Sequence, residues 1–339
     1  MSMKSSALDF FVCPTCKQPA LSLCGSDAGA SEIAEGELAC SQCGNTYPII
    51  GGIPRFVPPG NYAESFGFQW NRHRVTQLDS HTGLPISRNR LFEVTGWSTR
   101  LPGQTILEAG SGAGRFTEVL ATTGATILSM DYSTAVDANF TNHGYVPNLH
   151  LFQGDIFNIP LRPHSFDKVL CLGVIQHTPD PLGAVRSLVH FLRPGGELVV
   201  DVYARRVTAL LSWKYLLRPL TSRMDRMRLY DVISRWVPKM VPLAATLRML
   251  FGRPGARLLP IVEYSHLGLP PDLNREWAIL DTFDMYSAVH DHPQSLATMR
   301  QCFRDLGMSE IDVRDGPNGV IARGRLLQGA EETCAALSA

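Results

Sequence analysis

Four cysteines in two matched pairs are the residues of this chain best suited to hold a metal ion. Cys13 and Cys16 form the first CxxC pair, and Cys40 and Cys43 form the second after an interval of 23 residues. Paired turns of this kind direct four thiolates toward one tetrahedral zinc ion, as in a zinc ribbon. A redox CxxC is the alternative, but it does not explain two matched pairs. Because four thiolates complete the coordination, we expect a structural zinc ion rather than a catalytic one.

A glycine-rich turn, GSGAGR at 110–115, is the second feature of the sequence that could bind a ligand. It lies between a predicted buried strand at 104–109 and a predicted helix at 115–124. A turn without side chains lets a ligand approach the main chain, and amides at a helix start can meet a polar or anionic group. The pattern is GxGxG and departs from the dinucleotide fingerprint GxGxxG, because Arg115 stands where the third glycine is required.

Acidic residues follow the predicted strands after this turn. Asp131 ends the strand of ATILSMD, where it can accept hydrogen bonds from ribose hydroxyls, and Asp155 follows a third strand. A fourth strand begins near Asp167, and a fifth follows the Pro-Gly-Gly of FLRPGGELVVDVY. Strands that alternate with helices in this way predict an α/β fold with a doubly wound parallel sheet.

This series of motifs resembles the class I S-adenosylmethionine-dependent methyltransferases. The resemblance rests on ILEAGSGAGRF, SMDYS, GDIFNIPL, FDKVLCLGVIQHTPDP and LRPGGELVV, and it covers roughly residues 92–203. It implies a Rossmann-like, mostly parallel seven-stranded sheet, S-adenosylmethionine as cofactor and methyltransferase activity. Residues 1–58 resemble the short zinc-ribbon module that is fused to, or partners, other methyltransferases. In that group the ribbon docks a partner or presents a substrate.

The resemblance also implies roles for single residues. The glycine turn would wrap the methionine part of the cofactor, Asp131 would hold the ribose, and Tyr132 would pack near the adenine. Asp155 and Ile156 would contact the adenine itself. The implied cofactor-binding residues of the core are Glu108, Gly110, Ser111, Gly112, Gly114, Asp131, Tyr132, Asp155, Ile156, Leu172 and Gly173.

A further segment, 64–74, precedes the core. Its aromatic residues Phe66, Phe68 and Trp70 alternate with other residues, which predicts a strand or a segment that covers the core. In glycan and natural-product methyltransferases, FxxQW segments close over the cofactor. The resemblance therefore implies that Gln69 and Trp70 contact the cofactor.

Two groups of residues could bind the methyl acceptor. His177 follows the fourth strand, at the edge where doubly wound folds place ligands, and could act as a general base or only shape its loop. The polar stretch 279–293 precedes the final predicted helix. We read it as a loop that contacts substrate through Asp284, Tyr286 and His290 rather than as a metal site, because its spacing matches no metal motif.

The stretch 203–260 is strongly basic, with twelve Arg or Lys against two acids. A set of apolar residues recurs at helical spacing and predicts amphipathic basic helices, namely Met224, Met227, Tyr230, Ile233 and Val237. We expect a lid that faces an anionic partner rather than a merely solvated face. A nucleotide-sugar or lipid-phosphate acceptor, a membrane surface and RNA all fit this charge.

Composition sets the remaining limits. The 339 residues carry no net charge, no apolar run approaches the roughly 20 residues of a membrane span, and the N-terminus does not resemble a signal peptide. We therefore expect a cytoplasmic protein. The expected organisation is a zinc ribbon (1–58), a linker or cover segment (59–91), the cofactor-binding core (92–203), a basic helical insertion (204–262), the C-terminal part of the core (263–328) and a tail (329–339).

Together these features predict a zinc-ribbon-headed methyltransferase that acts on a small-molecule, glycan or natural-product acceptor, at oxygen, with an anionic or lipid-linked acceptor included. One alternative is an RNA base methyltransferase that holds RNA with the ribbon and the basic insertion. The other is a non-catalytic binding scaffold.

Overall fold

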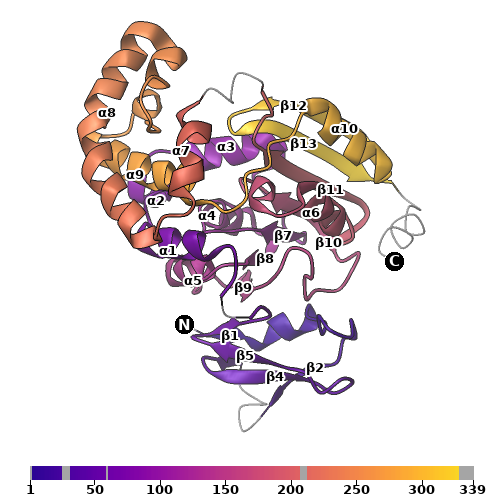
Figure 1. Cartoon of the computed structure of the whole chain (residues 1–339). Helices are drawn as coiled ribbons and strands as arrows, with labels where there is room; N and C mark the ends of the chain where they lie inside the picture. Colours follow the sequence, from indigo (N-terminus) through magenta and orange to yellow (C-terminus); the bar gives the residue numbers. More distant parts are fainter. Residues whose placement is uncertain (1, 25–30, 59, 207–211, 328–339) are drawn as a thin grey trace.

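A seven-stranded sheet lies at the centre of the computed structural model, which describes residues 2–24, 31–58, 60–206 and 212–327 (Figure 1). The strand order is β12-β13-β11-β10-β7-β8-β9, and only β13 runs antiparallel to its neighbours. This confirms the α/β fold with a doubly wound, mostly parallel seven-stranded sheet. The strands are β7 (Thr105–Ala109), β8 (Thr126–Asp131), β9 (Leu149–Gln153), β10 (Phe166–Cys171), β11 (Leu192–Val202), β12 (Met308–Gly316) and β13 (Gly319–Leu326).

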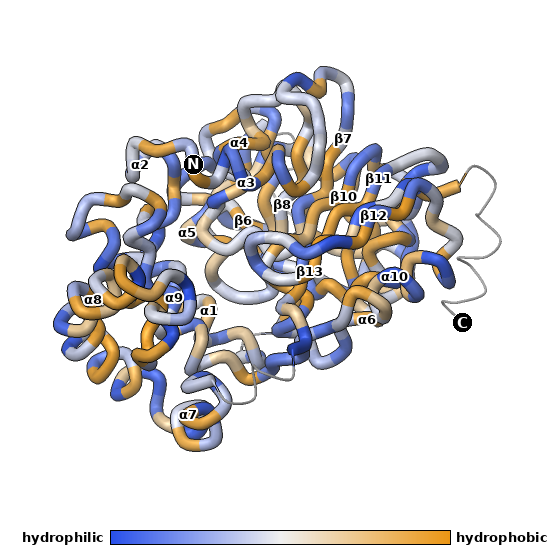
Figure 2. The backbone as a smooth tube through the Cα atoms, turned by 90° about the horizontal axis from the view of Figure 1, so that it is seen from above, coloured by the Kyte–Doolittle hydropathy of each residue, from blue (hydrophilic) through white to orange (hydrophobic). Residues whose placement is uncertain are grey.

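Both faces of this sheet are covered, so most residues of its central strands are buried and apolar. Successive side chains point to opposite faces, and Ile106 and Leu107 of β7 therefore belong to two different hydrophobic clusters. Figure 2 shows hydrophobic residues gathered on these central strands. One face packs against α3 (Ile86–Thr95), α4 (Thr117–Leu120) and α5 (Ala135–His143), and the other against α6 (Pro181–Val189) and α10 (Leu296–Asp305).

The N-terminal module completes the second of these faces. Its residues Phe11, Ile33, Leu38 and Ile49 belong to the same buried cluster as β8, β9 and β10. The connection 154–165 between β9 and β10 contains no helix, and the module covers the sheet there. Its elements are β1 (Met3–Lys4), η1 (Ser5–Asp9), β2 (Leu21–Cys24), β3 (Glu32–Ile33), β4 (Gly36–Cys40), β5 (Thr46–Ile50) and β6 (Ile53–Pro54).

Two of the local predictions were wrong about element type. Residues 64–72 form helix α1 (Glu64–Arg72), so the strand, one of the two alternatives for this segment, is wrong. Its three aromatic side chains have different neighbours, since Phe66 packs on His177, Phe68 on Tyr230 and Phe283, and Trp70 on Gly112. The stretch 279–293 is not all loop, because helix α9 (Pro271–Ser287) includes its first nine residues. Two short elements flank these helices, α2 (Asp79–Thr82) and η5 (Ser265–Leu267).

The helix predicted over 115–124 is also shorter than expected, since it consists of α4 and a 3-10 turn, η2 (Ala121–Thr123). The hydroxyls of Thr122 and Thr123 donate to the carbonyls of Val119 and Leu120, which takes these carbonyls away from a further helical turn. Helix α3 also crosses the boundary that the sequence suggested between residues 91 and 92, and Leu91 and Val94 are both fully buried in the core.

The insertion after β11 forms α7 (Trp213–Thr221) and α8 (Arg226–Ala256), the latter kinked at Gly252. Figure 1 shows α8 along one edge of the molecule, with the N-terminal module at the bottom. One side of α8 packs on α9 in a hydrophobic cluster separate from those of the sheet. In the described residues, no helix has both the length and the apolar character needed to cross a bilayer.

The shared core predicts that the N-terminal module stabilises the whole chain. The ring centroids of Phe11 and Phe152 lie 5.3 Å apart, and both side chains are almost fully buried. We expect Phe11→Ala to lower the free energy of unfolding by about 3–5 kcal/mol, as for other buried aromatic residues. Urea denaturation followed by circular dichroism measures this change. Ile50→Ala, at an exposed position of the same module, is the control and should leave the midpoint unchanged; equal midpoints for both variants would contradict a shared core.

Candidate active site

The glycine turn leaves β7 at the carboxyl edge of the sheet. The amides of Gly110 and Ser111 both donate to the carbonyl of Met130 on β8, at 2.8 and 2.9 Å, which holds the turn against the next strand. Gly110 and Gly112 have φ angles of +80° and +54°, which other residues rarely adopt. A Cβ on Gly110 would lie 2.2 Å from Val174. The bare backbone is therefore required for the chain to pack here at all.

The carboxylate of Asp131 joins the two strand ends. Its Oδ2 accepts the Gly112 amide at 2.9 Å, and its Oδ1 accepts the amide and the hydroxyl of Ser133 at 2.8 and 2.7 Å. Burial raises the pKa of Asp131, although these hydrogen bonds act in the opposite direction. A carboxylate oxygen can accept two hydrogen bonds, so Oδ2 keeps one position for a ligand hydroxyl.

The end of β9 lies beside Asp131 in the parallel sheet. Asp155 is half-buried there and accepts the Phe157 amide at 2.9 Å, while Ile156 is buried. Burial raises the pKa of Asp155. The ring of Tyr132 lies 5.0 Å from that of Tyr62, a residue that the sequence did not single out. These side chains form an apolar wall with a carboxylate beside it.

Glu108 lies inside the protein rather than on this edge. Its carboxylate accepts the hydroxyls of Thr117 and Ser129 at 2.5 and 2.8 Å, and Asn139 donates to both hydroxyls. Burial raises the pKa of Glu108 to about 7. Through these bonds Glu108 joins β7 to α4 and β8 beneath the turn, and its role as a cofactor-binding residue stays a prediction.

Helix α1 lies over the turn. The Trp70 indole lies over Gly112, where an added Cβ would come within 3.2 Å of its ring. Gln69 is fully buried. Gly67 fits against the start of α5, since a Cβ there would lie 2.3 Å from the Thr134 hydroxyl. The close approach at Gly67 therefore brings Gln69 and Trp70 over the sheet edge.

Several buried polar atoms around this edge have no hydrogen-bond partner among the described residues. They are Oε1 of Gln69, Oγ of Ser111, and both Oε1 and Nε2 of Gln176. Gln176 belongs to η3 (Ile175–His177), after β10, next to the Val174 that contacts the turn. Unpaired buried polar atoms are costly. Their number here fits a ligand with several donors and acceptors.

Leu172 and Gly173 lie between β10 and η3. Leu172 is buried, and the Gly173 amide donates to Asp201 on β11. Asp201 also accepts from Arg90 at 2.7 Å and from Asn318 at 3.1 Å. The backbone after β10 is thus fixed by a buried carboxylate that the sequence analysis did not single out.

His177 lies at the centre of a second group of side chains. Its Nδ1 lies 3.0 Å from the carbonyl of His290 and its Nε2 lies 3.9 Å from Oδ2 of Asp284. The Tyr203 hydroxyl donates to the same oxygen at 3.3 Å. Burial lowers the pKa of His177, while Asp284 acts to raise it. Phe66 of α1 packs against the imidazole ring, with centroids 5.1 Å apart.

The polar stretch 279–293 divides between two places. Asp284 and His290 reach the His177 group, as described above. Tyr286 does not, because its ring packs in the cluster between α8 and α9 and its hydroxyl donates to the carbonyl of Pro260 at 3.0 Å. Asp281 instead bonds Gln77 and Tyr264. Helix α9 separates residues that looked equivalent in the sequence.

Two residues of this second group were missed by sequence reasoning. Tyr203 directly follows β11, so its place at the carboxyl edge was a usable signal. Lys214 gave none. Its Nζ donates to Asp291 at 2.6 Å and lies 4.2 Å from the centre of the Tyr203 ring, and the packing of α7 against the end of α9 brings it there.

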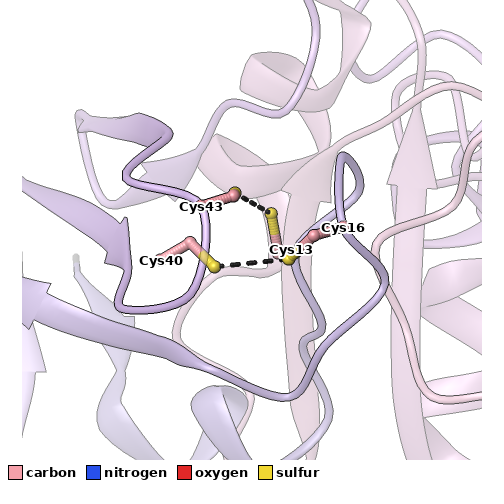
Figure 3. A group of neighbouring side chains, drawn as sticks. All are labelled: Cys13, Cys16, Cys40 and Cys43. Carbon is pink, nitrogen blue, oxygen red and sulfur yellow. Dashed lines mark hydrogen bonds between the residues drawn. The ribbon is translucent and has the colours of Figure 1, made fainter.

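The four cysteines of the N-terminal module come together at a separate site. Figure 3 shows their side chains directed toward one another, from the turn that follows Phe11 and from the turn after β4. All four sulfurs lie within 4.8 Å of one another, with the Cys13–Cys43 pair at 3.6 Å and the Cys16–Cys40 pair at 3.5 Å. Thiolates around a tetrahedral zinc ion are about 3.8 Å apart, given Zn–S bonds of about 2.3 Å. Among the described residues, this is the one cluster with the geometry of a metal site.

Comparison with known proteins finds two family models that match different parts of the chain. Residues 107–200 match the family model described as a methyltransferase domain, and residues 4–52 match the model described as a Trm112p-like protein. The ubiquinone biosynthesis O-methyltransferase of Pseudomonas fluorescens (strain Pf0-1) is 30% identical over 167 residues, which are 44% of this chain and 67% of the relative. The protein of the same name from Xylella fastidiosa (strain 9a5c) is 29% identical over 119 residues, or 34% of this chain and 48% of the relative.

Among solved structures, the complex between the Haloferax volcanii Trm112 methyltransferase activator and a methyltransferase has a TM-score of 0.45 and 13% identity, covering 78% of this chain and 99% of that one. A likeness this weak carries no argument. The sheet order, the family match over β7 to β11 and the identity to the Pseudomonas enzyme together establish the family. The chain belongs to the class I S-adenosylmethionine-dependent methyltransferases and carries an N-terminal module of the zinc-ribbon type.

Proposed function

We propose that this methyltransferase transfers a methyl group to a hydroxyl oxygen of a small-molecule acceptor bound beside His177. The observation that carries the proposal is the placement of His177 Nε2 between Asp284 and the carboxyl edge of the sheet. The O-methyltransferases among its relatives support oxygen as the methylated atom. Incubation with labelled S-adenosylmethionine, first with cell extract and then with a panel of hydroxylated aromatic compounds, tests it. A labelled product whose methyl is on nitrogen or carbon would overturn it.

The residues around the glycine turn fit the cofactor. The amides and the Ser111 hydroxyl at the turn would hold its amino-acid part, and the open acceptor position of Asp131 would hold a ribose hydroxyl. Asp155 and Ile156 would bind the adenine, with Tyr132 beside them, and Gln69 and Trp70 would close over it. When bound, the cofactor supplies an electrophilic methyl group.

His177 would act as the general base of the acceptor hydroxyl. Its Nδ1 proton donates to the His290 carbonyl, which leaves Nε2 without a proton and able to accept one. Burial keeps the imidazole neutral, and the Asp284 carboxylate would stabilise the cation formed after proton transfer. Phe66, Tyr62 and Tyr203 would surround an aromatic or otherwise apolar acceptor. Tyr286 is no part of this site.

The cofactor assignment is tested by a pair of glycine variants. Gly112→Val would place a side chain between Trp70 and the bound cofactor, so we expect calorimetry to detect no binding of S-adenosylhomocysteine. Gly103→Val is the matched control, because Gly103 also has a positive φ, +74°, but a Cβ there meets nothing within 4 Å. Both variants pay a similar backbone strain of about 1–2 kcal/mol. Equal affinity in the two variants would exclude the turn as the cofactor site.

The role of His177 is tested by its pH dependence. We expect His177→Gln to lower kcat by about 10²–10⁴-fold, as for loss of a general base, with little change in S-adenosylhomocysteine affinity. In the unmodified enzyme kcat should fall as the pH drops and His177 becomes protonated, with a midpoint below the ordinary histidine pKa of 6.5. The variant should lack this acidic limb. A variant that is slower but keeps the limb would show that His177 only shapes its loop.

We further propose that the four-cysteine cluster holds one structural zinc ion. Mass spectrometry should find one zinc per chain in the unmodified protein and in Cys24→Ser, since Cys24 is exposed and lies outside the cluster. Cys40→Ser should lose the metal. Chelation should then make the first 58 residues sensitive to protease and lower the melting temperature of the whole chain, because the module shares the core of the sheet. Iron in place of zinc, or full zinc content in Cys40→Ser, would contradict the assignment.

A further inference from the structure

Helix α8 carries a second apolar stripe that faces away from the protein. Its inner stripe, which includes Tyr230, Ile233, Val237 and Val241, is buried against α9. Val232, Trp236, Leu243 and Leu250 are spaced by 4, 7 and 7 residues, which places them together on the opposite side of a helix with 3.6 residues per turn. Their side chains are 47–63% exposed. The outer stripe has no partner among the described residues.

Helix α7 extends this apolar surface. Trp213, Leu216 and Leu220 are exposed at spacings of 3 and 4 residues, and the Trp213 indole donates to the Leu258 carbonyl at 2.9 Å, which joins α7 to the chain after α8. Of the sixteen exposed large apolar side chains in the described residues, eleven lie within 213–258. Single exposed apolar residues are ordinary, but such a concentration marks an interaction surface.

The same segment carries positive charge without counterions. Several of its basic residues are neutralised by ion pairs, as Lys214 is by Asp291, Arg226 by Glu64 and Arg248 by Glu263. The Lys239 ammonium lies 4.8 Å from the centre of the Trp236 ring, so charge and apolar surface meet directly. Six others have no acidic partner within 4.0 Å among the described residues, namely Arg223, Arg228, Arg235, Lys239, Arg253 and Arg257.

We propose that this outer face of α7 and α8 binds an anionic lipid surface. The aliphatic and Trp side chains would enter the boundary of the acyl chains, and the unpaired Arg and Lys side chains would meet lipid phosphates. RNA would satisfy the positive charges but not Val232, Leu243 and Leu250, which gain nothing from a phosphate backbone. An anionic bilayer satisfies both parts of the surface.

The surface also borders the acceptor site. Lys214 lies on α7, between the exposed Trp213 and the Tyr203 ring that packs on His177. An acceptor dissolved in the bilayer would therefore reach the enzyme at this edge. This last step alone rests on the proposed function; lipid binding can be tested without any methyl transfer.

Flotation with vesicles tests the proposal on the full chain. We expect binding to vesicles of equal parts phosphatidylcholine and phosphatidylglycerol, and much weaker binding to phosphatidylcholine alone. Trp236→Glu combined with Leu243→Glu removes the apolar part, and Arg235→Glu combined with Lys239→Glu removes the charge. Each pair should weaken binding by at least about tenfold. The control Tyr145→Glu changes an exposed aromatic residue on the loop after α5 and should bind like the unmodified protein.

Other occupants of the surface give different results. Vesicle binding that both double variants retain, or no vesicle binding at all, would overturn the proposal. So would salt-sensitive binding to single-stranded RNA without binding to vesicles. A dimer in light scattering that Trp236→Glu with Leu243→Glu converts to a monomer would assign the surface to a second copy of the chain. Thermal melting and S-adenosylhomocysteine binding verify that every variant is folded, and failure of methyl transfer alone would leave the lipid result intact.

Discussion

The hydrogen bond between the Gly112 amide and the Asp131 carboxylate is the contact on which the active site depends. It joins the turn after β7 to the end of β8, and the two Met130 carbonyl contacts hold the same turn in place. The geometry is available only because parallel strands end at one edge of the sheet. Glu108 supports the turn from inside and α1 covers it from outside. A change in any of these parts alters the position of the turn.

The N-terminal module is a layer of the fold as much as an attached domain. Phe11 and Phe56 pack on Phe152 of β9, and the main chain of residues 55–56 bonds to Gln153. The module covers the part of the sheet that the helix-free connection 154–165 leaves open. The module that holds the cysteine cluster therefore shares one hydrophobic core with β8 and β9, the strands whose carboxyl ends carry Asp131 and Asp155.

The insertion divides its residues between two environments. The inner stripe of α8 packs on α9, and α9 in turn places Asp284 beside His177. The outer stripe remains exposed, together with the unpaired cations. One side of α8 thus packs on the helix that holds Asp284 beside His177, while the other side is exposed together with the unpaired cations.

The sequence by itself determined the sheet, the glycine turn, the acids at the strand ends and the four-cysteine cluster. The single strands, the turn and each CxxC pair can be read from residue spacing within a short segment, while the matched pairs and the series of motifs indicated the cluster and the sheet. Only the tertiary structure decided that Asp284 meets His177 while Tyr286 does not, that Lys214 reaches Tyr203, and that the module shares the core of the sheet. Such contacts depend on how distant elements pack, and residue periodicity within a segment carries no information about its partner. Helix α1 is a further example, since its alternating aromatic residues allowed a strand or a cover segment, and only the packing of Phe66 and Phe68 on distant elements shows why a helix places them.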